Sequence, residues 1–186
     1  MHPDAAAVLD FWFGDEPVAR PEWFRKDPAF DAQIRERFDP LIERTLAGAR
    51  LGDGPAERLA ALVVLDQFTR NVFRDTPRAF AGDTAALDLA LGLCECGDDL
   101  ALPPWQRAFA CLPFEHAEDL ALQDRAVAAF EALARDHPQA ASMLDYAHRH
   151  REVIRRFGRF PHRNAILGRE STADELAFLE QPGSRF

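Results

Sequence analysis

An acidic segment with a histidine is the strongest candidate for proton transfer in the chain. Glu115, His116, Glu118 and Asp119 lie together in PFEHAEDLALQD, residues 113–124. Crowded carboxylates raise one another's pKa, and histidine titrates near neutrality, so the segment suits general acid–base catalysis. If the segment is helical, Glu115 and Asp119 share a face. The structural alternative is a helix N-terminus decorated with acids that favour the helix dipole.

A cationic corner, RFGRFPHRN at residues 156–164, contrasts with the acidic composition of the chain. Its arginines and the one just before it are Arg155, Arg156, Arg159 and Arg163. Gly158 is suited to end a helix with positive φ, and Pro161 stiffens the turn that follows. Arginines on constrained backbone suit recognition of carboxylate or phosphate. The alternative is that these arginines neutralise the protein's own acids.

A third polar group lies on a helix expected over residues 56–74. Asp66, Gln67, Arg70, Asn71 and Arg74 fill one arc of about 140° on that helix. The arc continues a face whose first residues are apolar, so its polar residues are expected to be at least partly buried. Because a buried charge needs a partner, Asp66 and Arg70, four residues apart, are predicted to form an ion pair. The alternative is a helix that emerges into water at its C-terminal end.

Histidine and cysteine spacing argues against a structural zinc site. His150 falls within the apolar face of a helix, where a hydrogen-bonded core histidine is the alternative to a ligand, and His148 points the opposite way. Cys94 and Cys96 fail the same spacing test. We therefore predict no metal and no cofactor, with a carboxylate–histidine metal site near Glu115 as the lesser alternative. The chain also lacks a nucleophile elbow, a phosphate-binding glycine loop and a dinucleotide fingerprint.

The sequence pattern predicts helices for all of the segments that position these groups. The expected fold is therefore a single all-α domain over residues 1–186. Asp27-Pro28 predicts a helix start, and Pro40 is expected to bend or divide the helix that follows. The other expected helices are 56–74, a short one from Thr76-Pro77, 83–94 capped by Asp83, a short one from Pro103-Pro104, 120–136, 138–157, and a last one opened by a Thr172–Glu175 capping box.

Composition excludes several classes of protein. The 186 residues carry a formal net charge of −9, which argues against nucleic-acid and anionic-membrane partners. The apolar run Leu59–Leu65 is too short to span a bilayer, no signal peptide is expected, and three cysteines make no disulfide framework. A cytoplasmic location is expected. Several aromatic residues are assigned to the core or to a homodimer surface, namely Trp12, Trp23, Phe24 and Trp105.

Several stretches resemble a bacterial family, domain-of-unknown-function family 924. They are VLDFWFG (8–14), WFRKDPAFDAQIRERF (23–38), LDQFTRNVFRDTPRAFAGD (65–83), LPFEHAEDLALQ (112–123) and HREVIRRFGRFPHRNAILGRESTADELAFL (150–179). The resemblance implies a tetratricopeptide-like array of about seven to nine helices, although no 34-residue consensus is visible. Thr69 stands where similar sequences lead us to expect proline. The family brings no established activity, but the resemblance supports treating three separated polar clusters as one site.

The sequence thus predicts a polar pocket that binds an anionic small molecule, with hydrolase- or lyase-type acid–base chemistry as one use of it. The candidate catalytic residues are His116, Glu115, Glu118 and His162. The candidate ligand-binding residues are Asp66, Gln67, Arg70, Asn71, Asp119, His150, Arg159, Arg163 and Asn164. The alternative is a non-catalytic, tetratricopeptide-like module that holds a peptide in a groove.

Overall fold

Every regular element in the described residues, 1–15 and 18–184 of the computed structural model, is helical. The α-helices are α1 (Pro3–Phe13), α2 (Pro28–Leu46), α3 (Pro55–Val63), α4 (Thr69–Val72), α5 (Asp83–Glu95), α6 (Pro104–His116), α7 (Leu120–Asp136), α8 (Ala141–Phe157) and α9 (Ala173–Leu179). The 3₁₀ turns are η1 (Pro21–Trp23), η3 (Pro77–Phe80), η4 (Asp98–Ala101), η5 (Pro138–Ala140) and η6 (Pro161–Arg163), and η2 (Val64–Phe68) is a π-helical turn. The prediction of a single all-α domain is confirmed.

Local capping signals account for several helix ends. The Asp27 carboxylate accepts two backbone N–H groups of the first turn of α2, and Pro28 is the first residue of that helix. At α9, Thr172 and Glu175 form the predicted reciprocal capping box. Gly158 ends α8 with φ of 69°, a left-handed conformation that favours glycine. These local signals confirm the predicted starts of α2 and α9 and the predicted end of α8.

Several predicted helix boundaries differ from the structure. The helix expected over residues 56–74 is interrupted by η2 and ends at Val72, and the helix expected over 138–157 begins with the 3₁₀ turn η5. Of the two expectations for Pro40, division of the helix is wrong, because α2 runs through it to Leu46. Pro40 and Glu36 are both exposed, so water can bond the carbonyl that lacks its usual helical donor. Asp83 does not cap α5, because Gly82 occupies the N-cap position and Asp83 is the first helical residue. Its carboxylate bonds Arg70 instead, at 2.8 and 3.0 Å.

The acidic segment also departs from the simplest expectation. Helix α6 ends at His116, and the chain is not helical again until Leu120. Glu115 and Asp119 therefore share no helical face. Asp119 instead caps α7, where its carboxylate accepts the Leu122 N–H at 3.0 Å. This capping role agrees with the structural alternative for Asp119, whereas Glu115 lies in the preceding helix.

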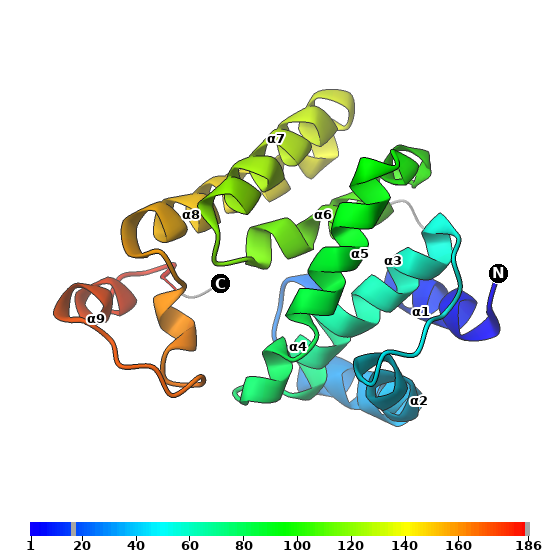
Figure 1. The fold of residues 1–186 in the computed structure, drawn as a ribbon, viewed down its shortest axis with the longest axis horizontal. Helices are drawn as coiled ribbons and strands as arrows, with labels where there is room; N and C mark the ends of the chain where they lie inside the picture. The colour runs from blue at the N-terminus through cyan, green and yellow to red at the C-terminus, as the bar shows by residue number, and fades with distance from the viewer. Residues whose placement is uncertain (16–17, 185–186) are drawn as a thin grey trace.

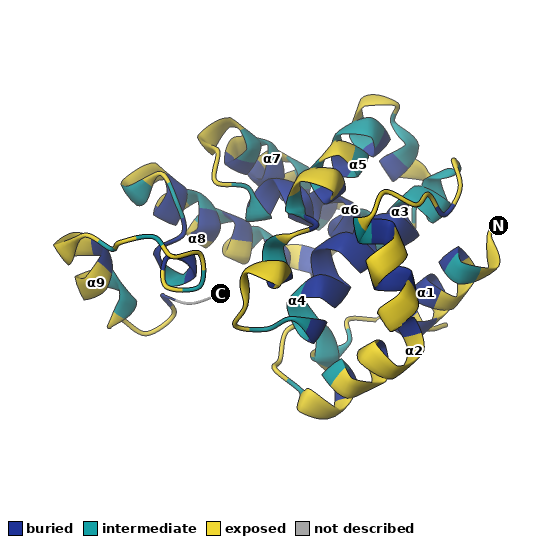
Figure 2. Ribbon diagram, turned by 60° about the horizontal axis from the view of Figure 1, so that its bottom comes forward, coloured by how far each residue is buried: buried dark blue, intermediate teal, exposed yellow. Residues whose placement is uncertain are grey.

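The core gathers on the helices at the centre of the molecule. Figure 2 shows buried residues concentrated on α3 and α6, while the outer surface of α2 and much of α9 are exposed. Trp12, from α1, packs its ring against Phe68 and Phe109, with centroids 5.6 and 5.7 Å away. Trp105 is also buried, whereas Phe24 is 52% exposed. No helix in the described residues has the length and hydropathy that crossing a membrane requires.

The arrangement in space brings distant parts of the chain together. Helices α7 and α8 lie side by side, and α6 packs against both (Figure 1). The segment after α8 carries η6 and α9 to one end of the molecule, opposite the N-terminus (Figure 1). Most of the polar residues described next come from η2, α4, α5, α6, α8 and η6, and α7 and α9 contribute partners to them.

Candidate functional site

A π-helical turn places the first residue of the site. Residues Val64–Phe68 are all buried and interrupt the α-helical geometry between α3 and α4. The hydroxyl of Thr69 donates to the Leu65 carbonyl at 2.7 Å, which helps to satisfy the backbone at this turn. Such single π turns inside helices are frequent at functional sites. Here the turn presents the carboxylate of Asp66, which is 1% exposed, to the end of α6.

Asp66 is held as a buried carboxylate by three partners. Its oxygens lie 3.0 Å from Arg70 Nη1 and 2.7 Å from His116 Nδ1, and accept the Gln67 amide at 2.6 Å. Burial opposes ionisation, but the Arg70 charge and the bonds from His116 and Gln67 outweigh it, so the pKa of Asp66 lies well below its ordinary value. Asp66 is therefore ionised at any physiological pH.

The contact with Asp66 fixes the tautomer of His116. An ionised carboxylate has no proton to donate, so His116 Nδ1 must carry the hydrogen and donate it. Burial lowers the pKa of His116, although the Asp66 charge works in the opposite direction. The ring is therefore a neutral imidazole whose Nε2 keeps its lone pair. The side chain is 15% exposed, and among the described residues only its Nδ1 is hydrogen-bonded.

A second carboxylate–histidine pair lies beside the first. His150 Nδ1 is 2.9 Å from the Tyr146 carbonyl and 3.0 Å from Glu115 Oε1. Because a carbonyl can only accept, Nδ1 carries the hydrogen, and both oxygens face it. The His116 and His150 ring centroids are 6.4 Å apart. The two pairs thus share one region at the end of α6.

In the second pair the carboxyl group is protonated, whereas in the first pair the carboxylate is ionised. Burial, together with the Asp66 charge, raises the pKa of Glu115 to about 8, so its carboxyl group is mostly protonated at neutral pH. Burial lowers the pKa of His150 to about 3, so this histidine is neutral. Since Oε1 of Glu115 faces an N–H group, the carboxyl proton belongs on Oε2. That atom is buried and has no hydrogen-bond partner among the described residues.

Two arginines complete the cluster around Asp83. Arg70 donates to both oxygens of Asp83, at 2.8 and 3.0 Å, besides contacting Asp66. Arg163 approaches the same carboxylate only to 3.6 Å, which is too long for a hydrogen bond. The Arg163 guanidinium carbon lies 4.8 Å from the Phe80 ring centroid and 4.5 Å from that of Phe160. Phenyl rings attract a cation but offer it no lone pair in the plane of its N–H groups.

Arg163 is consequently a buried cation without a hydrogen-bond acceptor in the described part of the chain. Its side chain is 9% exposed, and its Nε is fully buried and unpartnered. Burial and the neighbouring Arg70 charge lower the pKa of Arg163 to about 10, so it remains charged at neutral pH. The Asp83 charge and the two phenyl rings offset part of the cost of burying this cation, but its Nε–H group has no acceptor, and an unmet buried donor costs stability.

A buried amide fixes the end of α6 that carries Glu115 and His116. Gln123, on α7, is completely buried and donates its side-chain N–H groups to the carbonyls of Glu115 at 2.6 Å and Ala117 at 2.8 Å. These carbonyls lie where the helix stops and have lost their helical donors. Gln123 therefore holds in place the backbone from which both proton-transfer candidates project.

Of the predicted residues, the structure brings six into one connected cluster: Asp66, Gln67, Arg70, Glu115, His116 and His150. Arg163 adjoins them through Asp83 and Phe160. The Phe160 ring also lies 5.5 Å from that of His150. Contacts therefore run in a closed ring from Asp66 through the histidines, Phe160, Arg163, Asp83 and Arg70.

Other predicted residues bond elsewhere. The Asn71 amide donates to Asp31 of α2 at 2.9 Å, beside the Arg74–Asp31 ion pair. Asn71 thus points toward α2 while Asp66 points toward α6. Asp119 caps α7, as described above. These two polar side chains have evident structural partners outside the cluster.

The cationic corner divides between the site and the fold. Arg159 forms a two-bond ion pair with Glu175, at 2.6 and 2.8 Å. Asn164 is buried and donates to Ser171 at 3.0 Å and to Glu175 at 3.3 Å. These bonds fasten α9 to the turn after α8. Arg159 and Asn164 therefore stabilise the fold, and Arg159 agrees with the alternative in which arginines neutralise the protein's own acids. Arg163 makes no such two-bond pair with a carboxylate of the described residues.

Glu118 fastens the same turn from the other side. Its carboxylate accepts Arg169 at 2.6 and 2.9 Å and the Phe160 backbone N–H at 2.8 Å. His162, in η6, is half-buried with its ring centroid 5.6 Å from that of Phe160. Glu118 thus holds the backbone of Phe160, whose ring lies 4.5 Å from the guanidinium carbon of Arg163.

Sequence reasoning missed three contributors to the site. Asp83 had been assigned only to a helix start, and Phe80 and Gln123 had been assigned no role. A signal for Asp83 existed, since an acid beside Gly82 in an arginine-rich segment is a natural partner for Arg70. Gln123 has no such signal, because its partners are backbone carbonyls. No group of three or more potential metal ligands with suitable geometry occurs in residues 1–15 and 18–184.

The fold and this cluster define an all-helical protein with buried carboxylate–histidine pairs and arginines at the junction of its helices. The chain belongs to the family described as bacterial protein of unknown function (DUF924), which matches residues 8–183. It is similar to a solved structure, a protein of unknown function, ATU0120, from Agrobacterium tumefaciens. The identity is 38%, the match covers 95% of this chain and 96% of that chain, and the TM-score is 0.77. The comparison with curated proteins gave no match.

Proposed function

We propose that this protein is an enzyme that carries out acid–base chemistry on a small anionic molecule. The observation that supports this most strongly is the 2.7 Å contact between Asp66 and His116 Nδ1. It orients a neutral imidazole and leaves Nε2 to take a proton, as a general base requires. Water or a substrate C–H group is the proton donor that suits such a base, which gives hydrolase- or lyase-type chemistry.

The opposed protonation states of the two pairs support an acid–base role. His116 is a neutral base next to an ionised Asp66, while Glu115 is a protonated acid next to a neutral His150. Pairs of groups whose surroundings drive their pKa values apart are a recurring feature of acid–base catalysis. In this proposal His116 is the base and Glu115 is the acid or proton reservoir, with His162 the second candidate acid.

Arg163 is proposed to bind the anionic part of the substrate. A buried guanidinium whose Nε has no acceptor disfavours the folded state, so a structural role accounts poorly for it. An anion would supply the missing acceptor, while Arg70 remains bonded to Asp66 and Asp83. Glu118 would act indirectly, by positioning Phe160 beside Arg163.

The test is a turnover screen followed by a histidine exchange. Small esters, amides and hydroxy acids that carry a carboxylate or phosphate are incubated with the protein, and products are followed by proton NMR. His116→Gln should lower turnover by about 10²–10⁴-fold. His148→Gln, on the same helix as His150 but outside the cluster, should keep it. Equal turnover in wild type and His116→Gln would refute the assignment of the base.

A peptide-binding module is the second candidate function. It is favoured by a surface depression of about 470 Å³ lined by Arg156, Phe157, Arg159, Thr172, Asp174 and Glu175. Arginine and aromatic side chains beside a depression suit an extended peptide with an acidic group, and a tetratricopeptide-like arrangement of helices belongs to this proposal. Thermal stabilisation by peptides alone, lost in Arg156→Ala and kept in Arg163→Met, would favour the module over the enzyme.

A further inference from the structure

The hydrogen bonds of the other arginines indicate which kind of group Arg163 is suited to bind. Arg74, Arg155 and Arg159 each present the edge formed by Nε and Nη2 to a carboxylate of the protein. In the Arg159–Glu175 pair the distances are 2.6 and 2.8 Å. This two-bond geometry matches the planar fork of guanidinium to the planar carboxylate. Arg163 has the same edge, but its Nε lacks an acceptor in the described residues.

No described side chain accepts a hydrogen bond from Arg163 Nε. Asp83 is the nearest described carboxylate, at 3.6 Å, and both its oxygens already accept from Arg70. Glu118 interacts with Arg163 only through its charge and is bonded to Arg169 and Phe160. The described residues therefore supply no hydrogen-bond acceptor for Arg163 Nε.

The charges in the cluster favour an acceptor with one negative charge over one with two. At neutral pH, Asp66 and Asp83 are balanced by Arg70 and Arg163, since Glu115 holds its proton and both histidines are neutral. A bound monoanion would give the region a net charge of one negative unit. A bound dianion would give it two negative units, close to the existing carboxylates and in a site where the Arg163 side chain is only 9% exposed. Weak solvent screening makes that second charge costly.

We infer that the anionic group held by Arg163 is a single carboxylate of a small organic acid rather than a phosphate or other dianion. This inference rests on the proposed function, because it names the substrate class of the same site. The fork geometry favours a planar over a tetrahedral group, and the charge balance favours a monoanion over a dianion. The two features can be separated by experiment.

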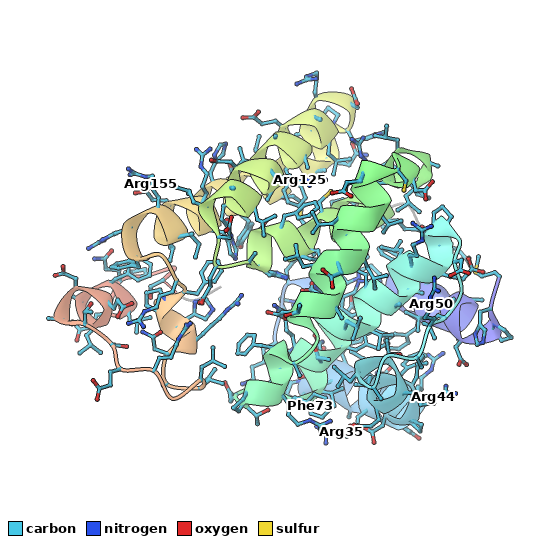
Figure 3. The ribbon with its side chains drawn as sticks, viewed as in Figure 1. Arg35, Arg44, Arg50, Phe73, Arg125 and Arg155 are labelled. Carbon is cyan, nitrogen blue, oxygen red and sulfur yellow. The ribbon has the colours of Figure 1, made fainter. Side chains whose placement is uncertain are left out.

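The experiment titrates three probes at pH 7 and constant ionic strength: acetate, a planar monoanion; methanesulfonate, a tetrahedral monoanion; and sulfate, a tetrahedral dianion. The readout is the NMR resonance of the Arg163 Nε–H group, assigned by its absence in Arg163→Met. Acetate should bind at least tenfold more tightly than sulfate, and methanesulfonate should lie between them. Arg155→Gln is the matched control, since Arg155 projects from the outer side of α8 with its side chain 64% exposed (Figure 3).

Arg163→Lys keeps the charge but loses the fork, so it should bind acetate and methanesulfonate equally well when followed by thermal shift. In wild type, sulfate binding as tight as acetate, or methanesulfonate equal to acetate, would overturn the carboxylate inference and leave the anion site standing. If none of the probes moved the Arg163 resonance, the anion-binding part of the proposed function would fall as well. Loss of acetate binding in Arg155→Gln would place the anion elsewhere and overturn the inference.

Discussion

Gly82 packs directly against the backbone of Leu65, so closely that a Cβ on Gly82 would lie 2.3 Å from the Leu65 carbonyl oxygen. Leu65 belongs to the π turn that presents Asp66, and Gly82 precedes Asp83, the shared partner of the arginines. The absence of a side chain at residue 82 therefore sets the distance between α5 and η2. This close approach places Asp83 beside Arg70, which also contacts Asp66 four residues before it.

Gly82→Ala should destabilise the protein by about 1–3 kcal/mol, because the obstructing atoms are backbone and the helices must separate. Gly92→Ala in the same helix is the control, since nothing lies within 4 Å of a Cβ there. It should raise stability by about 0.5–1 kcal/mol through the helix propensity of alanine. Urea unfolding followed by circular dichroism measures both. Equal effects of the two changes would show that the contact between Gly82 and Leu65 is not tight.

Arg163 and Arg159 should respond oppositely to removal of their charge. Arg163→Met keeps an apolar side chain beside Phe80 and Phe160 and removes a buried cation that has no hydrogen-bond acceptor among the described residues. We expect its unfolding free energy to stay the same or to rise by roughly 1 kcal/mol. Arg159→Met leaves the buried Glu175 without its two-bond partner and should lower the melting temperature. A large loss of stability in Arg163→Met would instead indicate a structural role.

Several helices could be predicted from the sequence because their ends are specified locally, whereas α1 and the π turn within residues 56–74 were not predicted. The Thr172–Glu175 box and the helix over Leu120–Asp136 depend on neighbouring residues alone. The Asp66–Arg70 pair was likewise predictable from a spacing of four residues. Helix α2 continues through Pro40 because the backbone that loses its hydrogen bond there is exposed to water, and exposure depends on tertiary packing.

The grouping of polar residues was only partly predictable. An ideal helix puts Asp66, Arg70 and Asn71 on one arc, yet a π turn lies within this segment and Asn71 bonds Asp31 of α2. Likewise, Arg159 and Arg163 lie close together in the sequence but have different partners, because α9 places its Glu175 beside Arg159 and not beside Arg163. The path of a distant segment decides which carboxylate lies beside which arginine. The residues next to each arginine in the sequence do not predict this pairing.

Asp66→Asn should lower the pKa of His116 and of Glu115 together. The Asp66 charge stabilises a protonated His116, and it also opposes ionisation of Glu115. Removing that charge therefore makes His116 harder to protonate and Glu115 easier to ionise. NMR titration of the histidine ring nitrogens and the glutamate carboxyl carbons measures both values. A rise in either pKa would contradict the arrangement in which Asp66 is the common ionised neighbour.

Glu115 should make the protein less stable as the pH rises toward 8. Its pKa is 4.5 in an ordinary setting and about 8 in the folded protein, because burial and the Asp66 charge disfavour ionisation. Between these values the folded state holds a proton that the unfolded state has released, so stability falls by up to about 1.4 kcal/mol per pH unit. His150 and His116, which also face this region, have lowered pKa values and contribute equally to wild type and variant.

Glu115→Gln removes that dependence, so its unfolding free energy relative to wild type should increase by about 2–3 kcal/mol between pH 5.5 and 7.5. Glu118→Gln is the matched control. Burial opposes ionisation of Glu118, but its bonds from Arg169 and Phe160 outweigh burial and lower its pKa, so its contribution is fully present above pH 4.5 and constant over this range. Urea denaturation at each pH gives the two differences. A flat difference for Glu115→Gln would mean that Glu115 is already ionised at pH 5.5, and the assignment of Glu115 as the acid beside a basic His116 would then fail.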